Sequence, residues 1–169
     1  PRGCLLRSGK WYMELNIHRT SASGGTCLGV VTERFNSKSG AVGADVSSWG
    51  VSPKGLRHAD QITMISSGDL WQDGDVIGCL VDCKQAELRF FRNGVELQGG
   101  VASFADVRGQ IGLCPALTIE CGFLGFLNLG MSPFRYPPNV TEVKAVHAYI
   151  QEQRALQKLS TSNAPGQMR

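Results

Sequence analysis

Residues 71–97 read WQDGDVIGCLVDCKQAELRFFRNGVEL, and this stretch decides the fold. Its opening, 71–75, is a polar run of turn residues, and 76–81 is a short apolar run of strand length. Successive side chains of a strand point to opposite faces, and both faces of 76–81 are apolar. We therefore predict a central strand that is covered on each side, which requires a second layer.

The same stretch predicts a hairpin. In an extended strand, residues 86–92 place Ala86, Leu88 and Phe90 on one face and the charged Glu87 and Arg89 on the other. They are followed by Asn93-Gly94, the dipeptide suited to a type I′ turn. The chain is thus expected to turn back tightly after 86–92.

Other patterned segments predict further strands, at 10–17, 27–31, 62–65, within 111–119 and at 123–129. Pro115 interrupts the fourth of these and, because proline has no backbone N–H, belongs on an edge or at a bulge. The polar stretches 20–25, 32–40 and 51–61 are predicted to be loops, and 98–100 with 104–109 to form a connection. The predicted fold class is all-β, an antiparallel two-sheet β-sandwich.

The C-terminal part changes character after Pro137-Pro138. Asn139 and Glu142 have the spacing of a capping box, and a weak apolar stripe follows. We predict a sandwich domain over 1–138, a helix over 139–159 and a disordered linker or tail over 160–169, which is small and polar. Residues 139–141 also match a glycosylation sequon, which matters only in a secreted chain.

Composition limits the class of protein. With 169 residues and 42% hydrophobic residues, the chain is long enough for one core and short for two, and Gly 21 favours many turns. The net charge of +3 gives little electrostatic drive toward nucleic acid. We therefore expect no nucleic-acid partner. No apolar run is long enough for a membrane span, so we expect no membrane partner either. The isolated domain is predicted to be a monomer. Because the chain starts at Pro1 without Met, we expect a fragment of a larger protein.

Several segments in order resemble a known family. These are SGKWYMEL, GADVSSWGVSPKG, GDVIGCLVD, LRFFRNGVEL, CPAL and FLNLGMSPFRYPP, which together span about residues 4–138. Each segment alone is a weak signal, but their order resembles that of the SPRY domain. The resemblance implies a concanavalin-like β-sandwich that acts in protein recognition, and in that family often as the substrate-selecting part of a ubiquitin ligase or an adaptor.

The resemblance further implies a cytoplasmic, non-catalytic module that presents loops to a peptide or protein partner. No RING or SOCS-box element is visible in the sequence, so a ligase role concerns the remainder of the protein. In the SPRY-domain SOCS-box branch, a tyrosine after Ser-Trp-Gly helps hold an asparagine-rich peptide. Here Arg57 stands at about that place, which argues against that peptide and suits an acidic or carbonyl partner.

Polar residues in two predicted loops are the candidate recognition surface, since loops on a rigid scaffold carry most binding sites. The candidate partner-binding residues are Arg34, Asn36, Trp49, Lys54, Arg57 and His58. Trp11 is predicted to lie in the core and Trp71 to plug one end of the sandwich. For Trp49, a plug and a partner-facing anchor both remain open.

Catalytic and metal chemistry find little support. The histidines His18, His58 and His147 lie in no known motif, so we predict no catalytic residue and no cofactor. Cys79 and Cys83 would lie about 13 Å apart on an extended strand, too far to share a zinc ion, and we predict no metal site. The six cysteines favour a reduced intracellular protein, with disulfides in a secreted protein as the alternative.

Two other functions remain as alternatives. Concave β-sandwiches also form lectins, and tryptophan rings suit sugar faces, so carbohydrate binding is the second hypothesis. Nucleic-acid binding through the basic loops is the third.

Overall fold

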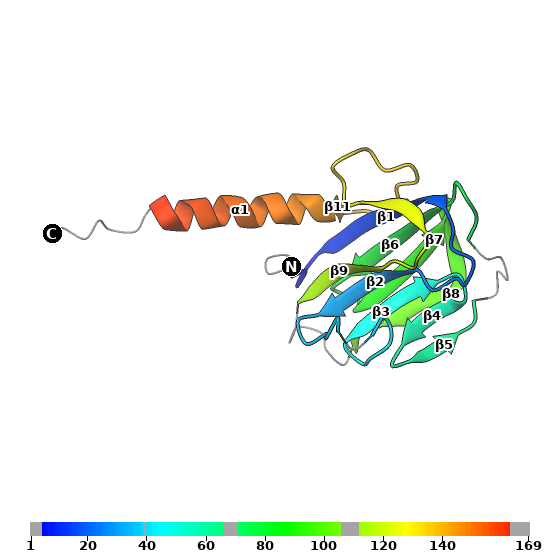
Figure 1. Cartoon of the computed structure of the whole chain (residues 1–169). Coiled ribbons are helices and arrows are strands. Elements are labelled where there is room, and N and C mark those ends of the chain that lie inside the picture. Colours follow the sequence, from blue (N-terminus) through cyan, green and yellow to red (C-terminus); the bar gives the residue numbers. More distant parts are fainter. Residues whose placement is uncertain (1–4, 39, 66–70, 106–111, 163–169) are drawn as a thin grey trace.

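The computed structural model describes residues 5–38, 40–65, 71–105 and 112–162. Two antiparallel sheets face each other, and a single helix, α1, extends away from them (Figure 1). One sheet has six strands, in the order β10-β1-β6-β7-β8 with β11 paired to β1, and the other has five, in the order β5-β4-β3-β2-β9. The predicted two-sheet β-sandwich is confirmed.

The elements have the following bounds. They are β1 Lys10–Arg19, β2 Cys27–Thr32, β3 Ser48–Ser52, β4 Gly55–His58, β5 Gln61–Thr63, β6 Val76–Asp82, β7 Glu87–Arg92, β8 Val95–Ser103, β9 Leu113–Thr118, β10 Leu124–Asn128, β11 Val143–Ala145 and α1 Val146–Ser162. The hairpin turn between β7 and β8 is of type I′, with φ of 51° at Asn93 and 83° at Gly94. Pro115 lies on β9, an edge strand, as predicted.

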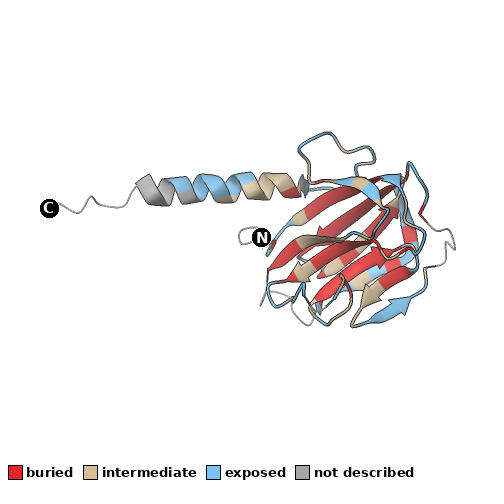
Figure 2. Cartoon of the chain, viewed as in Figure 1, coloured by how far each residue is buried: buried red, intermediate tan, exposed pale blue. Residues whose placement is uncertain are grey.

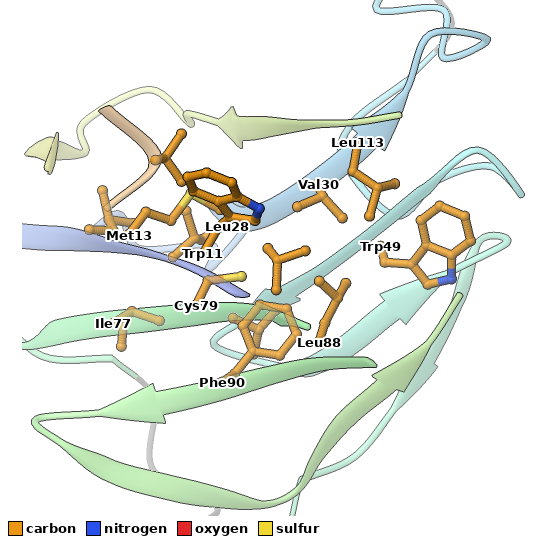
Figure 3. Close-up of a cluster of buried hydrophobic side chains, with 14 of the residues drawn as sticks. Trp11, Met13, Leu28, Val30, Trp49, Ile77, Cys79, Leu88, Phe90 and Leu113 are labelled. Atoms are coloured by element: carbon orange, nitrogen blue, oxygen red, sulfur yellow. The ribbon is translucent and has the colours of Figure 1, made fainter. Parts of the chain in front are cut away.

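The main core lies between the two sheets. Every residue of β6 is buried, as expected for a central strand, and the buried residues follow the inner strands, whereas α1 is exposed mainly beyond its first turns (Figure 2). Side chains from both sheets meet in this core, among them Trp11, Ile77 and Phe90 from one sheet and Leu28 and Trp49 from the other (Figure 3). The alternation of β1 and β7 decides which of their side chains enter it.

The other face of the six-stranded sheet is covered by the chain itself. Residues 129–142, here called the strap, leave β10, cross this face and lead into β11, which pairs in parallel with β1. Phe134 of the strap packs on a second cluster formed by Tyr12, Leu80 and Phe91. Burial of β6 on its second face therefore depends on a loop and not on another sheet.

A buried carboxylate fixes the strap. Glu14 is fully buried, and its two oxygens accept the backbone N–H groups of Arg135 and Tyr136 at 2.9 and 2.8 Å. The Tyr12 hydroxyl donates to the Tyr136 carbonyl at 2.9 Å. These bonds tie a segment of irregular backbone to the centre of the sheet, since hydrogen bonds to a buried charge are among the strongest in proteins.

Two predicted connections are strands instead. The stretch 51–61, predicted as a loop, completes β3 and forms β4 and the start of β5. Val51 and Leu56 of this stretch face the core, and polar residues such as Arg57 face outward, so the stretch resembles a polar loop in sequence. The predicted strand 62–65 is correspondingly shifted to Gln61–Thr63. Residues 98–100 are a bulge within β8, where Gly99 takes a φ of 76° and the register against β7 shifts.

The predicted start of the helix is also wrong. Glu142 has a φ of 62°, which a residue inside a right-handed helix cannot adopt, so the capping box at Asn139 does not form. The chain instead pairs with β1 through β11, and α1 begins at Val146. Pairing with an existing strand outweighs a local capping signal.

Some predictions fall outside the described residues. These concern Cys4, Ile111, residues 106–109 of the predicted connection and 163–169 of the predicted tail. Residues 160–162, predicted to be part of that tail, still belong to α1.

We expect Leu80→Asp to lower the free energy of unfolding by about 3 kcal/mol or more, because it places an unpaired charge beneath the strap. Leu156→Asp is the matched control, since Leu156 on α1 is 59% exposed whereas Leu80 is 2% exposed. Thermal and urea unfolding measure both variants. Equal stability of the two would show that the strap does not bury this face.

We expect Glu14→Ala to release the strap, because it leaves two buried N–H groups without an acceptor at about 1–3 kcal/mol each. Hydrogen exchange at the amides of Arg135 and Tyr136 should accelerate, with a smaller change at β6. Glu96→Ala, at an exposed position of β8, is the control. Unchanged protection of both strap amides would contradict the role of Glu14.

Candidate functional site

The structure separates the predicted site residues along the five-stranded sheet. Arg34 and Asn36 are exposed in the loop after β2, and that loop lies at the end of the sheet where Thr32 bonds Ser47. Lys54 is exposed in the β3–β4 turn, at the opposite end. Because β4 has four residues, Lys54 lies about 13 Å along the sheet from His58. The six residues therefore do not form one cluster.

Trp49 is a core residue and not an exposed anchor. Its side chain is 3% exposed, and its ring stacks on His58, the residue directly opposite on β4, at a centroid distance of 4.8 Å. Phe104 meets the ring edge-on at 6.4 Å. Of the two roles left open by the sequence, the structure shows the internal one. Trp71, at 6% exposure, is likewise a plug.

Arg57 is half-buried on the outer face of β4. Its guanidinium lies 3.8 Å from the Asp60 carboxylate and its side chain is 19% exposed. The Nε of Arg57 has no hydrogen-bond partner among the described residues. Gly43 lies against the Arg57 side chain so closely that a Cβ there would clash, which explains the glycine. Arg57 is thus fixed by packing while part of its charge faces solvent.

Loops from both sheets meet at the end that holds Lys54. They enclose a hollow of about 430 Å³, here called the end hollow. It is lined by Thr20, Ser21, Ala22, Ser23, Gly24, Thr26, Pro53, Lys54, Trp71 and Phe123. Of the described residues that line it, only Lys54 carries a charge. The end hollow therefore offers the Lys54 ammonium group and apolar carbons to a ligand, because the Thr20, Ser21 and Ser23 hydroxyls already donate to carboxylates of the protein.

A carboxylate clamp holds the loop that forms most of this lining. Glu120 accepts hydrogen bonds from the Ser21 hydroxyl at 2.6 Å, the Ser23 hydroxyl and the Gly25 N–H at 2.7 Å. These bonds, with a smaller contribution from Lys54, lower the pKa of Glu120 to about 2. At neutral pH the Glu120 carboxylate is therefore ionised and accepts all three hydrogen bonds.

A second depression lies on the outer face of the same sheet, toward its other end. This face groove has a volume of about 770 Å³ and runs between β9 and the loop after β2. Its walls and floor include Val31, Phe35, Val42, Cys114 and Ala116. Both depressions expose more apolar than polar surface, and they differ in charge, since Lys54 lines the end hollow and Glu33 lines the face groove.

The three histidines lie on three different elements. His18, His58 and His147 lie on β1, β4 and α1, where they contact Phe126, Trp49 and Gln151. Burial raises the pKa of the Cys27 thiol to about 12, which makes it a poor nucleophile at neutral pH.

Five cysteines of the described residues have free thiols. Cys27, Cys79, Cys83 and Cys114 are buried, and Cys121 is exposed. Burial, reinforced by the Asp82 carboxylate, raises the pKa of Cys83 to about 11.

Comparison with known proteins agrees with this architecture. The family model of the SPRY domain matches residues 10–129, which is most of the chain and extends from β1 to just past β10. The chain belongs to the SPRY domain family. SPRY domains are protein-interaction modules, and the match includes the strands and loops that form both depressions.

A curated relative gives a wider context for this SPRY domain. Over 70 residues the chain is 39% identical to the E3 ubiquitin-protein ligase RKP of Arabidopsis thaliana. The aligned part is 41% of this chain and 6% of that protein, so the chain spans a small fraction of its relative. In the described part of the SPRY domain, no helix is long and apolar enough to cross a membrane.

Sequence reasoning missed Glu120, which accepts hydrogen bonds from the loop lining the end hollow, and Phe35, which lines the face groove. Glu120 is the only charged residue between Arg108 and Arg135, and this isolation in an apolar stretch is a signal that could have singled it out. Phe35, in a polar loop, had a similar signal as its only large apolar side chain. The hydroxyl-rich residues 20–25 were predicted as a loop without a role.

We expect the chemical shift of the Gly25 amide to follow the protonation of Glu120 as pH falls, because this amide donates to the Glu120 carboxylate. Because the folded-state pKa of Glu120 lies below its ordinary value of 4.5, the clamp is complete above about pH 4.5 and is lost as pH falls toward 2. The Gly25 amide chemical shift should therefore titrate with a midpoint near 2, and Glu120→Gln should abolish the titration. A midpoint near 4.5 would show that the carboxylate is not held by these bonds.

Proposed function

We propose that this SPRY domain recognises a protein or peptide partner through the end hollow, and that in its full-length protein it selects the substrate of a cytoplasmic ubiquitin ligase. The observation that carries the proposal is the convergence of loops from both sheets around Lys54, with the β1–β2 loop tied to Glu120 by three hydrogen bonds. A rigid site binds without an entropic cost of ordering its own loops. The ligase role draws on the similarity to RKP.

The charges favour an acidic segment in the partner. Lys54 is the charged residue of the end hollow, and Arg57 lies three residues further along the same hairpin, on the outer face. An extended segment advances about 3.3 Å per residue, so one that binds Lys54 reaches Arg57 within about three residues. The guanidinium can then bind a carboxylate with two parallel hydrogen bonds.

The other predicted contacts are proposed to act at the far end of this path. Arg34 and Asn36 would meet a partner long enough to follow the outer face from the end hollow, and His58, which faces inward beside Trp49, would be reached only at the end of β4. Trp49 contributes indirectly, by holding the ring of His58.

Protein recognition is favoured over carbohydrate binding by the tryptophans. All three rings are buried, at 4%, 3% and 6% exposure for Trp11, Trp49 and Trp71. A sugar face needs an exposed ring on which to stack, and none of the three provides one.

Affinity capture with the tagged domain tests the proposal, with Lys54→Glu as the variant. We expect partner affinity to fall by about 2 kcal/mol or more, because the substitution reverses the charge of the end hollow. Lys84→Glu is the matched control, an exposed lysine in the turn between β6 and β7 at the opposite end. Calorimetry on the captured partner gives the magnitude.

If the two variants bind alike, recognition does not use the end hollow. The ligase role is tested separately in the full-length protein, where ubiquitination of the partner should depend on Lys54. A partner that binds but is never ubiquitinated would contradict the ligase role and leave recognition standing.

A further inference from the structure

The loop between β1 and β2 is tied to the rest of the domain by its own hydroxyl groups. Thr20 donates to the Asp73 carboxylate at 3.1 Å. Ser21, at 2.6 Å, and Ser23 both donate to Glu120. Phosphorylation reverses a contact of this kind, because the modified oxygen has no proton to donate and its phosphate is largely dianionic at pH 7. The loop is thus built from contacts that a phosphate would break.

Ser23 is the hydroxyl of this loop that a modifying enzyme can reach. It is exposed, as is its neighbour Ala22, whereas Thr20 and Ser21 are half-buried. Arg19 is also exposed and precedes Ser23 by four residues. Protein kinases select their substrates in part by charges close to the modified residue, and a basic residue upstream is one such charge.

One oxygen of Glu120 depends on Ser23. The Ser23 hydroxyl donates to Oε1, whereas the Ser21 hydroxyl and the Gly25 N–H both donate to Oε2. A phosphate on Ser23 would remove the donor to Oε1 and would lie against an ionised carboxylate, which repels it. The modified side chain must therefore turn away from Glu120, while the two bonds to Oε2 can persist.

A cation lies on the other side of the same loop. Lys54 and Ser23 both line the end hollow. A Cβ placed on Gly24, the residue after Ser23, would lie 3.7 Å from Cε of Lys54. Lys54 is exposed and forms no salt bridge with any residue that the structure describes. A phosphate that leaves Glu120 therefore has an ammonium group within reach, and such pairs form strong hydrogen bonds.

We propose that Ser23 is a phosphorylation site that closes the end hollow to an acidic partner. A serine/threonine protein kinase transfers the γ-phosphoryl group of ATP to the Ser23 hydroxyl oxygen. The bond from Oγ to phosphorus forms, the bond from the γ-phosphorus to the bridging oxygen breaks, ADP leaves, and the hydroxyl proton passes to the base of the kinase. The phosphate then pairs with Lys54 and occupies the cation of the end hollow. Only this last effect on binding rests on the proposed function.

Two titrations of the complete 169-residue chain, phosphorylated at Ser23 during synthesis, test the switch without a partner. The midpoint of the Gly25 amide titration, about 2 in the unmodified chain, should rise by about one unit, because Glu120 loses a donor and gains a negative neighbour. Ser23→Ala removes the donor without adding charge and should raise the midpoint less. Phosphorylation at Ser132, an exposed serine of the strap, is the control and should leave the midpoint unchanged.

The second titration follows the phosphate itself by phosphorus NMR. Because a nearby cation favours the dianion, Lys54→Ala should raise the pKa of the phosphate on Ser23 by about half a unit. The same substitution should not change the pKa of a phosphate on Ser132. An unchanged phosphate pKa on Ser23 would show that the phosphate does not pair with Lys54.

Modification and binding are measured on the same chain. After incubation with ATP and a panel of serine/threonine kinases, mass spectrometry should find phosphate on Ser23. In affinity capture, the domain phosphorylated at Ser23 should retain at least tenfold less of the partner than the unmodified domain. The inference is overturned if no kinase modifies Ser23, if either titration is unaffected, or if both forms capture the partner equally. If Lys54→Glu leaves capture by the unmodified domain unchanged, the proposed function fails, and the two titrations still decide whether the phosphate pairs with Lys54.

Discussion

Strands β1 and β6 are paired on both edges along much of their length and buried on both faces, and this double burial is the constraint that organises the molecule. One face is met by the five-stranded sheet. The other has no sheet to cover it, so the chain must supply a cover of irregular backbone, whose polar groups need partners of their own. Glu14 is the solution, because one buried carboxylate satisfies two N–H groups of the strap from the middle of β1.

Much of the sandwich was predictable because its signals are local. The apolar run of β6, the alternation of β1 and β7 and the Asn93-Gly94 turn each follow from neighbouring residues. The errors come from pairing with distant segments. β3 and β4 are rich in serine, glycine and basic residues; β3 gains stability by pairing with β2, and β4 by pairing with β3. β11 forms where a capping signal predicted helix, because β1 offered a free edge. A sequence window cannot show which edge is free.

The candidate site was also predictable only in its local features. Residue types that suit recognition were found in the correct strands and loops, but their grouping was not, because Lys54 and His58 lie at opposite ends of a strand that had been predicted as a loop. Trp49 likewise lies on a strand, β3, where the alternation of side chains directs its ring into the core. The end hollow is held by a contact between residues almost a hundred positions apart in the chain, Ser21 and Glu120. The two depressions of this SPRY domain thus lie at one end and on the outer face of the same five-stranded sheet.

The parallel pairing of β11 with β1 has a mechanical consequence. Lys10 lies opposite Val143 and Tyr12 opposite Ala145, so the first residues of the sandwich and the last run side by side in the same direction. A pull on the chain before Lys10 and after Ala145 would draw the two strands past each other and load their hydrogen bonds together, instead of opening them one after another. Tension transmitted through a longer protein would therefore load the three pairs between β1 and β11 at the same time, while β1 itself stays anchored to β6 along its other edge.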